Sequence, residues 1–240
     1  MKKTIVVMPV ANEEETMGEL LDKLLALPYD NLFVYPVIDS YSKDRTEEII
    51  RAKESTGRVK CIFHATSKGV ISCYLEGFRK ALEDGAEYII EMDGGLSHLP
   101  EQLPQFIEKL ESGYDCVWGS RFMKGGKMLH HPLYRRILSQ GGTWLANIVL
   151  GTRLKDMTSG YEGFTRQVLE NMNLDQILSQ GHMYQTEMRY YCRNLHTIEV
   201  PISYVGGKSS LKGSSVKEAL DLLFQLKEQE KNVWKNPWNK

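Results

Sequence analysis

The sequence predicts an α/β protein in which helices cover both faces of a mostly parallel sheet. Short apolar runs alternate with amphipathic helical patterns through the first half of the chain. Glycine or proline stands at most of the changes from one pattern to the next. The 240 residues suffice for one large domain, and neither an internal repeat nor a linker divides them. A single domain is therefore expected over residues 1–232, followed by a short tail at 233–240.

The first half yields five strands and four helices in alternation. The expected strands are Thr4–Val10, Leu32–Asp39, Val59–His64, Glu87–Asp93 and Tyr114–Ser120. The expected helices are residues Glu14–Leu27, Asp44–Glu54, Lys68–Glu83 and Pro100–Leu110. The first helix has leucines at helical spacing, and the last has Pro100 in its first turn and Gly113 beyond its end. Crossovers of this length join parallel strands.

The second half is less regular. Phe122–His131 is expected to be a loop and Pro132–Leu150 a helix. Further along, we expect a strand, two helices, a strand, a flexible basic loop and a closing amphipathic helix, at Ser159–Thr165, Arg166–Met172, Tyr184–Asn194, Thr197–Val205, Gly206–Ser215 and Val216–Lys231. Trp234 and Trp238 in the tail either pack on the body or touch a membrane surface.

Composition excludes several classes of protein. Hydrophobic residues make up 42% and charged residues 25%, which is typical of soluble globular proteins. The net charge of −1 gives no general field for nucleic acid, so a nucleic acid acceptor is disfavoured. The four cysteines match no zinc framework and suit free thiols in a reducing cytoplasm. No apolar span reaches 18 residues, so no transmembrane helix is expected and the protein is placed in the cytoplasm.

In parallel sheets, ligands collect beyond the carboxyl ends of the strands. The residues at those ends are Pro9–Glu13, Asp39, His64–Lys68, Asp93–His98 and Gly119–Arg121. This edge therefore carries carboxylates, a lysine followed by a helix start, and an arginine. A helix start and cations suit anionic ligands such as phosphates.

These strand ends resemble the family-2 glycosyltransferases of the GT-A fold, a Rossmann-like architecture. Within that family they are most similar to the dolichyl- or polyprenyl-phosphate mannosyl- and glucosyltransferases. The resemblance rests on motifs in the family's order: Pro-x-x-Asn-Glu at Pro9–Glu13, Met-Asp-x-x-Leu-Ser-His-x-Pro at Met92–Pro100, Gly119–Phe122, Gly125-Gly126, Arg135-Arg136, Thr158–Tyr161, Tyr184–Met188 and Glu199–Tyr204. It covers about residues 4 to 225.

The resemblance implies a donor that is a nucleoside-diphosphate sugar, UDP- or GDP-linked, and a divalent metal, Mg²⁺ or Mn²⁺. Its donor-binding residues would be Pro9, Ala11, Glu13, Asp39, Lys68, Asp93, Gly94 and Gly95. Phosphates of donor or acceptor would face Arg121, Arg135, Arg136, Lys208 and Lys212. Asp93, Arg121, Gln185 and Glu187 would lie at the reaction centre. The metal neutralises charge that develops on the leaving diphosphate.

The chain departs from the family within this site. The second acid of the Asp-x-Asp metal motif is Gly95, and the arginine expected after Ser-Gly-Tyr is Glu162. Glu162 and His98 are candidate replacement ligands beside Asp93. Otherwise the metal is held weakly or is dispensable. Retained catalysis is favoured over decay because Glu13, Asp39, Asp93, Arg121 and Glu187 all remain.

The resemblance favours inverting transfer to a polyprenyl phosphate, with contact to a membrane surface. A soluble acceptor, such as a glycan, a small molecule or a hydroxylated nucleobase, is the alternative, and would require Glu187 or Glu162 as a general base. A sugar-nucleotide-binding protein without turnover is a second alternative. A nucleotidylyltransferase would need a glycine-rich loop after the first strand, and Ala11–Glu14 is not one.

Overall fold

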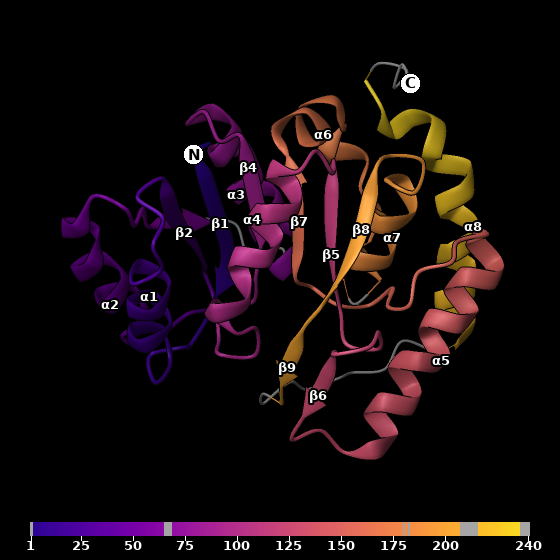
Figure 1. Cartoon of the computed structure of the whole chain (residues 1–240), viewed down its shortest axis with the longest axis horizontal. Coiled ribbons are helices and arrows are strands. Elements are labelled where there is room, and N and C mark those ends of the chain that lie inside the picture. Colours follow the sequence, from indigo (N-terminus) through magenta and orange to yellow (C-terminus); the bar gives the residue numbers. More distant parts are fainter. Residues whose placement is uncertain (1, 65–68, 180, 182, 207–215, 236–240) are drawn as a thin grey trace.

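The computed structural model describes residues 2–64, 69–179, 181, 183–206 and 216–235. Within these residues, seven strands form one sheet in the order β3-β2-β1-β4-β7-β5-β8 (Figure 1). They are β1 (Thr4–Val10), β2 (Leu32–Asp39), β3 (Ile62–His64), β4 (Tyr88–Glu91), β5 (Cys116–Ser120), β7 (Glu162–Thr165) and β8 (Thr197–Pro201). The sheet confirms the predicted α/β class.

All strands of this sheet except β7 run in the same direction. β1 pairs in parallel with β2 and β4, β2 with β3, and β5 with β8. β7 lies between β4 and β5 and is antiparallel to both. The long helix between β5 and β7 returns the chain to the carboxyl edge of the sheet. β7 therefore enters the sheet from that edge and runs against its neighbours.

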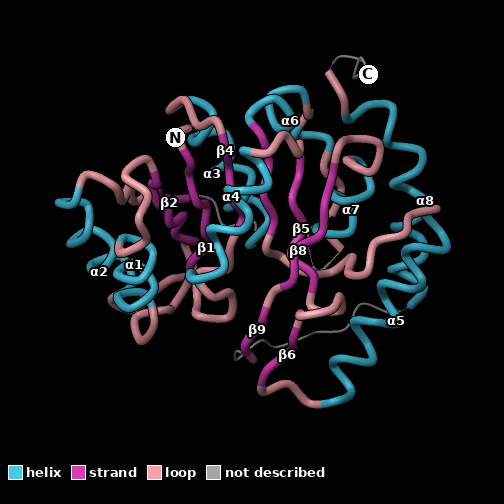
Figure 2. Tube along the Cα trace, in the orientation of Figure 1, coloured by secondary structure: helices cyan, strands magenta, loops and turns pink. Residues whose placement is uncertain are grey.

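Helices cover both faces, as Figures 1 and 2 show. One face carries α1 (Met17–Leu25), α2 (Thr46–Lys53) and α4 (Leu103–Glu111). The other carries α3 (Val70–Glu83), α5 (Leu133–Leu150), α6 (Arg166–Asn171), α7 (Tyr184–Tyr191) and α8 (Val216–Val233). Three 3₁₀ turns complete the described chain, at Glu54–Thr56, Pro100–Gln102 and Leu174–Gln176.

The alternation of side chains along β1 separates two hydrophobic cores. Ile5 and Val7 pack into the core beneath α3 and α6, whereas Val6 and Met8 pack into the core beneath α1 and α4. Successive side chains of a strand point to opposite faces, so a strand buried on both faces is apolar throughout. This explains why β1 reads as a continuous apolar run.

A second sheet of two short parallel strands lies near the carboxyl edge of the first. It pairs β6 (Lys127–Leu129) with β9 (Ser203–Val205). The expectation that Phe122–His131 is entirely loop is therefore wrong, and the expected strand Thr197–Val205 is two strands in different sheets. The change of sheet occurs at Ile202, whose N–H bonds to Ser120 O and whose carbonyl accepts from Lys127 N.

Several element boundaries differ from the expected ones. The first helix begins at Met17 rather than at residue 14, and the helix after Gly69 begins at Val70. The strand expected at 159–165 begins at Glu162, and the helix expected at 184–194 ends at Tyr191. The expected basic loop lies outside the described residues except for Gly206. Across the described chain, no helix has the length and apolarity needed to cross a membrane.

Candidate active site

The loops that follow β1 and β2 are bound to each other at the carboxyl edge. Glu13 N–H donates to Thr46 Oγ1 at 2.8 Å, and Glu14 N–H donates to Asp44 Oδ2 at 3.0 Å. Asn12 adopts a left-handed backbone conformation, with φ of 56°, and its Oδ1 accepts from Lys43 N–H at 2.9 Å. These bonds fix the exit of β1, where Pro9, Ala11 and Glu13 were predicted to hold a nucleoside.

Asp39 ends β2 beside this loop pair. It is almost fully buried, and its Oδ1 accepts from Tyr41 N–H at 3.0 Å. Cys73 Sγ lies 3.9 Å from its Oδ2. The carboxylate is thus held at the base of the predicted donor site. Lys68, Lys208 and Lys212 lie outside the described residues.

Asp93 follows β4 and is held from both sides. Its backbone N–H donates to His98 Nδ1 at 3.1 Å, and Tyr74 Oη donates to its Oδ1 at 3.4 Å. The Asp93 side chain nevertheless stays 38% exposed. Among the predicted metal ligands, it is the carboxylate that solvent reaches.

His98 serves the backbone of this turn. Its ring is buried and stacks on Tyr161, with ring centroids 4.9 Å apart. Burial lowers the pKa of His98, so the ring is neutral. Because Nδ1 accepts the Asp93 N–H, the ring proton is on Nε2, which leaves no lone pair for a cation. His98 is therefore not available as a metal ligand in this arrangement.

The glycines after Asp93 allow close approach of the β1 loop. A Cβ at Gly94 would clash with the Pro9 carbonyl oxygen. A Cβ at Gly95 would lie 3.3 Å from Glu13 Oε2, which also accepts from Thr16 Oγ1 at 2.9 Å. Gly95, where the family has its second acid, thus faces the Glu13 carboxylate, which Thr16 already holds in place.

Arg121 follows β5 and is almost fully buried. Its Nε and Nη2 bond to the two oxygens of Asp156 at 2.8 and 2.9 Å, and Nη2 also donates to Thr158 Oγ1 at 2.6 Å. Asp156 keeps a lowered pKa despite its burial, because Arg121 bonds to it. This bidentate pair fixes the plane of the guanidinium group.

An aromatic ring joins the two halves of the site. The Tyr204 ring lies 5.6 Å from the Arg121 guanidinium and 5.2 Å from the His98 ring. The His131 ring stacks on the Tyr204 ring with centroids 5.1 Å apart, and burial together with the nearby charge of Arg135 lowers the pKa of His131. The structure therefore brings Arg121 and Arg135 near Asp93. Arg136 is exposed on the same helix, α5.

Glu187 is removed from the reaction centre. It is fully buried, and its two oxygens accept the N–H groups of Leu178 and Ser179, both at 2.8 Å. A carboxylate with both oxygens engaged in holding backbone is poorly suited to remove a substrate proton. We assign it a structural part in fixing the segment before α7.

Glu162 also lies inside the protein. It pairs with Arg189 of α7, with Nε 2.8 Å from Oε1, and both side chains are fully buried. Arg189 further donates to the carbonyl oxygens of Asp156, Gly119 and Ser159. A buried carboxylate paired with an arginine cannot reach the surface beside Asp93, so Glu162 is not available as a metal ligand.

A second acid faces Glu162 across the sheet. Glu91 of β4 is its direct partner in the antiparallel pairing, and Gln185 Nε2 donates to Glu91 Oε1 at 3.4 Å. Burial and the facing carboxylate of Glu162 hold the pKa of Glu91 well above its ordinary value. A Cβ at Gly160 would lie 3.2 Å from Gln185 Nε2 and 3.6 Å from Asp93 Oδ1. Gln185 therefore links this buried cluster to the site.

A divalent metal fits this site through one protein carboxylate. In the described part of the chain, no three His, Cys, Asp or Glu side chains converge as a metal centre. Mg²⁺ commonly binds through one or two carboxylates, substrate phosphates and water. The exposed oxygens of Asp93 suit a metal that arrives with a diphosphate.

Sequence patterns assigned no role to four residues of this site. Asp156, Tyr74 and Arg189 contact the predicted residues from a loop and two helices distant in sequence. Tyr204, the last residue of the Glu199–Tyr204 motif, contacts Arg121 and His98 from β9. Asp156 stands two residues before the Thr158–Tyr161 motif, which was an available signal. Arg189 follows Met188 of another motif, but nothing local distinguishes a buried arginine from an exposed one.

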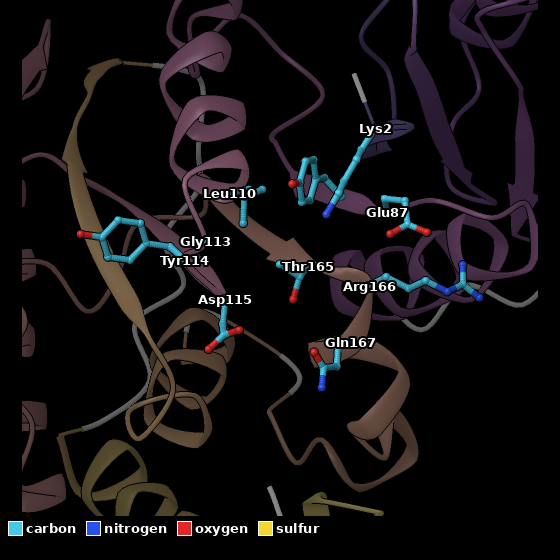
Figure 3. A pocket seen from close by; sticks show the side chains of 10 residues that line it. Lys2, Glu87, Leu110, Gly113, Tyr114, Asp115, Thr165, Arg166 and Gln167 are labelled. Carbon is cyan, nitrogen blue, oxygen red and sulfur yellow. The ribbon is translucent and has the colours of Figure 1, made fainter. Parts of the chain in front are cut away.

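A separate hollow lies at the opposite edge of the sheet (Figure 3). Its lining includes Lys2, Glu87, Asp115, Thr165 and Gln167, near the start of β4 and β5 and the end of β7. The carboxyl edge, where the predicted residues converge, is the candidate active site.

Known proteins resemble this chain over most of its length. Residues 5–172 match the family model described as Glycosyl transferase family 2. Over 228 residues the chain is 34% identical to an undecaprenyl-phosphate mannosyltransferase of Micrococcus luteus, which covers 91% of both chains. A polyprenol monophosphomannose synthase of Mycolicibacterium smegmatis is 31% identical, over 91% of this chain and 84% of its own length.

The fold has counterparts among solved structures. A glucosyl-3-phosphoglycerate synthase from Mycobacterium tuberculosis, crystallised with Mn²⁺, UDP and glucosyl-3-phosphoglycerate, superposes with a TM-score of 0.67 at 13% identity. The match covers 97% of this chain and 81% of that one.

Proposed function

Since the chain belongs to glycosyl transferase family 2 and has its GT-A fold, we propose that this glycosyltransferase transfers a sugar from a nucleoside-diphosphate sugar to a polyprenyl phosphate. The observation that carries the proposal is the arrangement around Tyr204. Besides burial, the charges of Asp93 and Arg121 both act on the pKa of Tyr204, so a partly exposed carboxylate and a fixed cation lie near the same ring. The carboxylate suits a metal bound to the donor diphosphate, and the cation suits the phosphate of the acceptor.

The donor would occupy the loops after β1, β2 and β4. Asp39 would accept hydrogen bonds from the nucleoside, next to Pro9, Ala11 and Glu13. Gly94 and Gly95 would allow the diphosphate to approach the backbone. Asp93 would hold Mg²⁺ or Mn²⁺ together with the diphosphate, and the metal would neutralise charge on the leaving group.

The acceptor would enter beside β6, β9 and α5. Arg121 would bind its phosphate, and Arg135 and Arg136 would add positive charge at the entrance. Asp156 keeps the Arg121 guanidinium oriented before the acceptor arrives, which lowers the entropy lost on binding. Lys208 and Lys212, which lie outside the described residues, remain predicted ligands of the acceptor phosphate.

The reaction would be an in-line displacement. An oxygen of the acceptor phosphate forms a bond to the anomeric carbon while the bond from that carbon to the donor diphosphate breaks. The nucleoside diphosphate leaves with the electron pair, and the configuration at the carbon inverts. A phosphate is already an anion at neutral pH, so no protein group must remove a proton. This agrees with the engagement of both Glu187 oxygens by backbone N–H groups.

The first test measures release of nucleoside diphosphate by the purified chain. UDP- and GDP-linked sugars are each offered with a short-chain polyprenyl phosphate in detergent, with and without Mn²⁺. A glycan, glycerol phosphate and a single-stranded oligonucleotide serve as soluble acceptors. We expect release that depends on the polyprenyl phosphate and yields a lipid-linked sugar phosphate.

Three results would overturn the proposal. Turnover with a soluble acceptor in place of the lipid would select the alternative acceptor class. Donor binding in a thermal-shift assay without transfer to any acceptor would select a binding protein. A product that retains the donor's anomeric configuration would exclude the single displacement.

A further inference from the structure

The helix α5 exposes a broad apolar face. Six large side chains of this helix are each more than half exposed to solvent: Leu133, Tyr134, Ile137, Leu138, Trp144 and Ile148. Isolated exposed apolar residues are common on soluble proteins, but a continuous patch indicates an interaction surface. Figure 1 shows α5 at the margin of the molecule, beside α8.

Helical geometry places these residues opposite the contact with the body. At about 100° per residue, the six side chains fall within an arc of about 140°. Thr143, Ala146 and Leu150 are buried and lie on the other side of the helix. The apolar face thus points directly away from the fold and is not a part of its core.

Charge on this part of the chain is strongly segregated. Residues 116–155 contain no Asp or Glu, although the whole chain has 31 acidic residues against 30 basic ones. Cationic side chains in the same segment are Arg121, Lys124, Lys127, Arg135, Arg136, Arg153 and Lys155. A near-neutral protein therefore presents an apolar helix face on a segment whose charged side chains are all cationic.

We propose that α5 docks on the surface of an anionic lipid bilayer, with its apolar face in the interfacial layer and its arginines at the level of the lipid phosphates. This combination of an apolar stripe and flanking cations is what anionic membrane surfaces attract. The inference rests on the proposed function, because a polyprenyl phosphate resides in a bilayer.

A second copy of the chain fits this face less well. A two-fold interface places the same patch of each copy against itself. Arg135 and Arg136 of α5 would then lie near the same arginines of the partner, and segment 116–155 supplies no acid to separate them. Lipid phosphates, in contrast, complement them.

The docking surface adjoins the candidate active site. His131 stacks on Tyr204, and α5 begins two residues later at Leu133. Tyr204 in turn lies against Arg121 and His98. A bilayer under α5 would therefore hold a lipid phosphate close to Arg121 while its chain stays among the lipids.

The test is vesicle sedimentation of the full chain without donor or acceptor. Vesicles of phosphatidylglycerol and of phosphatidylcholine are compared at low salt. The variant combines I137S, W144S and I148S, and Phe63→Ser is the matched control, since Phe63 is 53% exposed on β3 at the other edge of the sheet. Melting temperatures confirm that both variants fold.

We expect the natural chain and F63S to bind phosphatidylglycerol vesicles at least about tenfold more tightly than phosphatidylcholine vesicles. The triple variant should lose about tenfold or more in affinity for the anionic vesicles, because it lacks three apolar side chains that docking would bury in the bilayer. Brominated lipids should quench tryptophan emission of the natural chain and quench that of W144S less.

Equal binding to both lipids, or unchanged binding by the triple variant, would overturn the proposal. A dimer in sedimentation velocity that the triple substitution dissociates would assign the face to a second copy instead. The proposed function is tested separately, by transfer to a short-chain polyprenyl phosphate in detergent. If the chain does not bind vesicles, the membrane-docking role of α5 is overturned but the proposed acceptor is not. If the chain binds vesicles but does not transfer sugar to the polyprenyl phosphate in detergent, the proposed acceptor is overturned but docking is not.

Discussion

At the scale of single residues, the site depends on how Asp93 is held. Tyr74 donates to its side chain and His98 accepts its backbone N–H, yet the carboxylate remains accessible. These contacts come from α3 and from the turn after β4. The carboxylate is therefore oriented before any ligand binds.

Substitution of Asp93 tests this role directly. We expect Asp93→Asn to lower kcat by about 10²–10³-fold, because charge on the leaving diphosphate loses its stabilisation. Thermal shift by nucleoside diphosphate should also lose its dependence on Mn²⁺. An unchanged Mn²⁺ dependence would contradict the assignment, and the melting temperature of the variant without ligand serves as the control.

Gly95 offers a second test at residue scale. Restoring the family's acid with Gly95→Asp places a carboxylate beside Glu13, since the new Cβ lies 3.3 Å from Glu13 Oε2. Like charges this close repel, so we expect no gain in Mn²⁺ affinity from the single substitution.

The double variant Glu13→Gln/Gly95→Asp removes this repulsion. Its Mn²⁺ affinity, measured by electron paramagnetic resonance in the presence of nucleoside diphosphate, should exceed that of Gly95→Asp alone. Glu13→Gln by itself is the matched control. Tighter Mn²⁺ binding by Gly95→Asp alone would show that Glu13 does not oppose the acid.

At the scale of elements, one buried ion pair joins the sheet to α7 and to the loop before β7. Arg189 pairs with Glu162 and bonds to backbone carbonyl groups at residues 119, 156 and 159. The same loop holds Asp156, which orients Arg121. Glu162 thus replaces the expected arginine at its position, and Arg189 supplies a cation from the neighbouring helix.

Removing Arg189 should be severe. We expect Arg189→Met to lower the free energy of unfolding by about 3–5 kcal/mol, because Glu162 is left buried without its partner. Glu162→Gln/Arg189→Met should be more stable than Arg189→Met alone, since no lone charge remains. Urea unfolding followed by circular dichroism measures both, and equal stability of the two variants would contradict the ion-pair account.

The pair of acids between β4 and β7 predicts a dependence of stability on pH. Burial raises the pKa of Glu162 to about 7, and the pKa of Glu91 is raised well above its ordinary value of 4.5. Acids with raised pKa values bind protons more tightly in the folded chain than in the unfolded one. Their stabilising contribution is complete below about pH 4.5 and is lost as pH rises through about 7 and beyond.

Glu91→Gln should therefore be more stable than the natural chain at pH 8, by about 1.4 kcal/mol for each unit of pKa shift removed. Near pH 4 the advantage should vanish, because Glu91 is then protonated in both states. Urea unfolding across this range, without divalent metal, provides the measurement. Parallel curves at all pH values would contradict a raised pKa at Glu91.

At the scale of the whole molecule, charge is nearly balanced in total and segregated in space. The segment 116–155 carries cations without acids, and its Arg121 and His131 contact Tyr204 at the candidate active site. The rest of the chain therefore has an excess of acids. This asymmetry orients the molecule towards an anionic surface.

Salt should separate docking from chemistry. The Debye length falls from about 10 Å at 0.1 M to about 3 Å at 1 M ionic strength. We expect transfer to polyprenyl phosphate in anionic vesicles to fall steeply between 0.05 and 0.5 M NaCl. Transfer to a short-chain acceptor in uncharged detergent should change much less, and equal losses in the two assays would contradict docking by charge.

Sequence patterns predicted most of the sheet because its strands are buried on both faces. β1, β2, β4 and β5 consist mostly of apolar residues, and such short apolar runs predict buried strands. β6 and β9 have three residues each, too few for a period to emerge. β6 was missed, and β9 was predicted only as a continuation of β8. The antiparallel direction of β7 was also missed. It depends on the edge of the sheet to which α5 returns the chain, and that edge is set by tertiary packing.

The sequence by itself determined that acids and cations gather at the carboxyl ends of parallel strands, because strand burial and turn residues are local properties. Only the tertiary structure decided what each charge does. Asp93 stays open, while Glu162, Glu187 and Arg189 are buried with partners. The partner of a buried charge is selected by packing between distant segments, and Glu162 and Arg189 meet across 27 positions of sequence. The exposed face of α5 likewise became visible only when its opposite side was seen to pack on the fold.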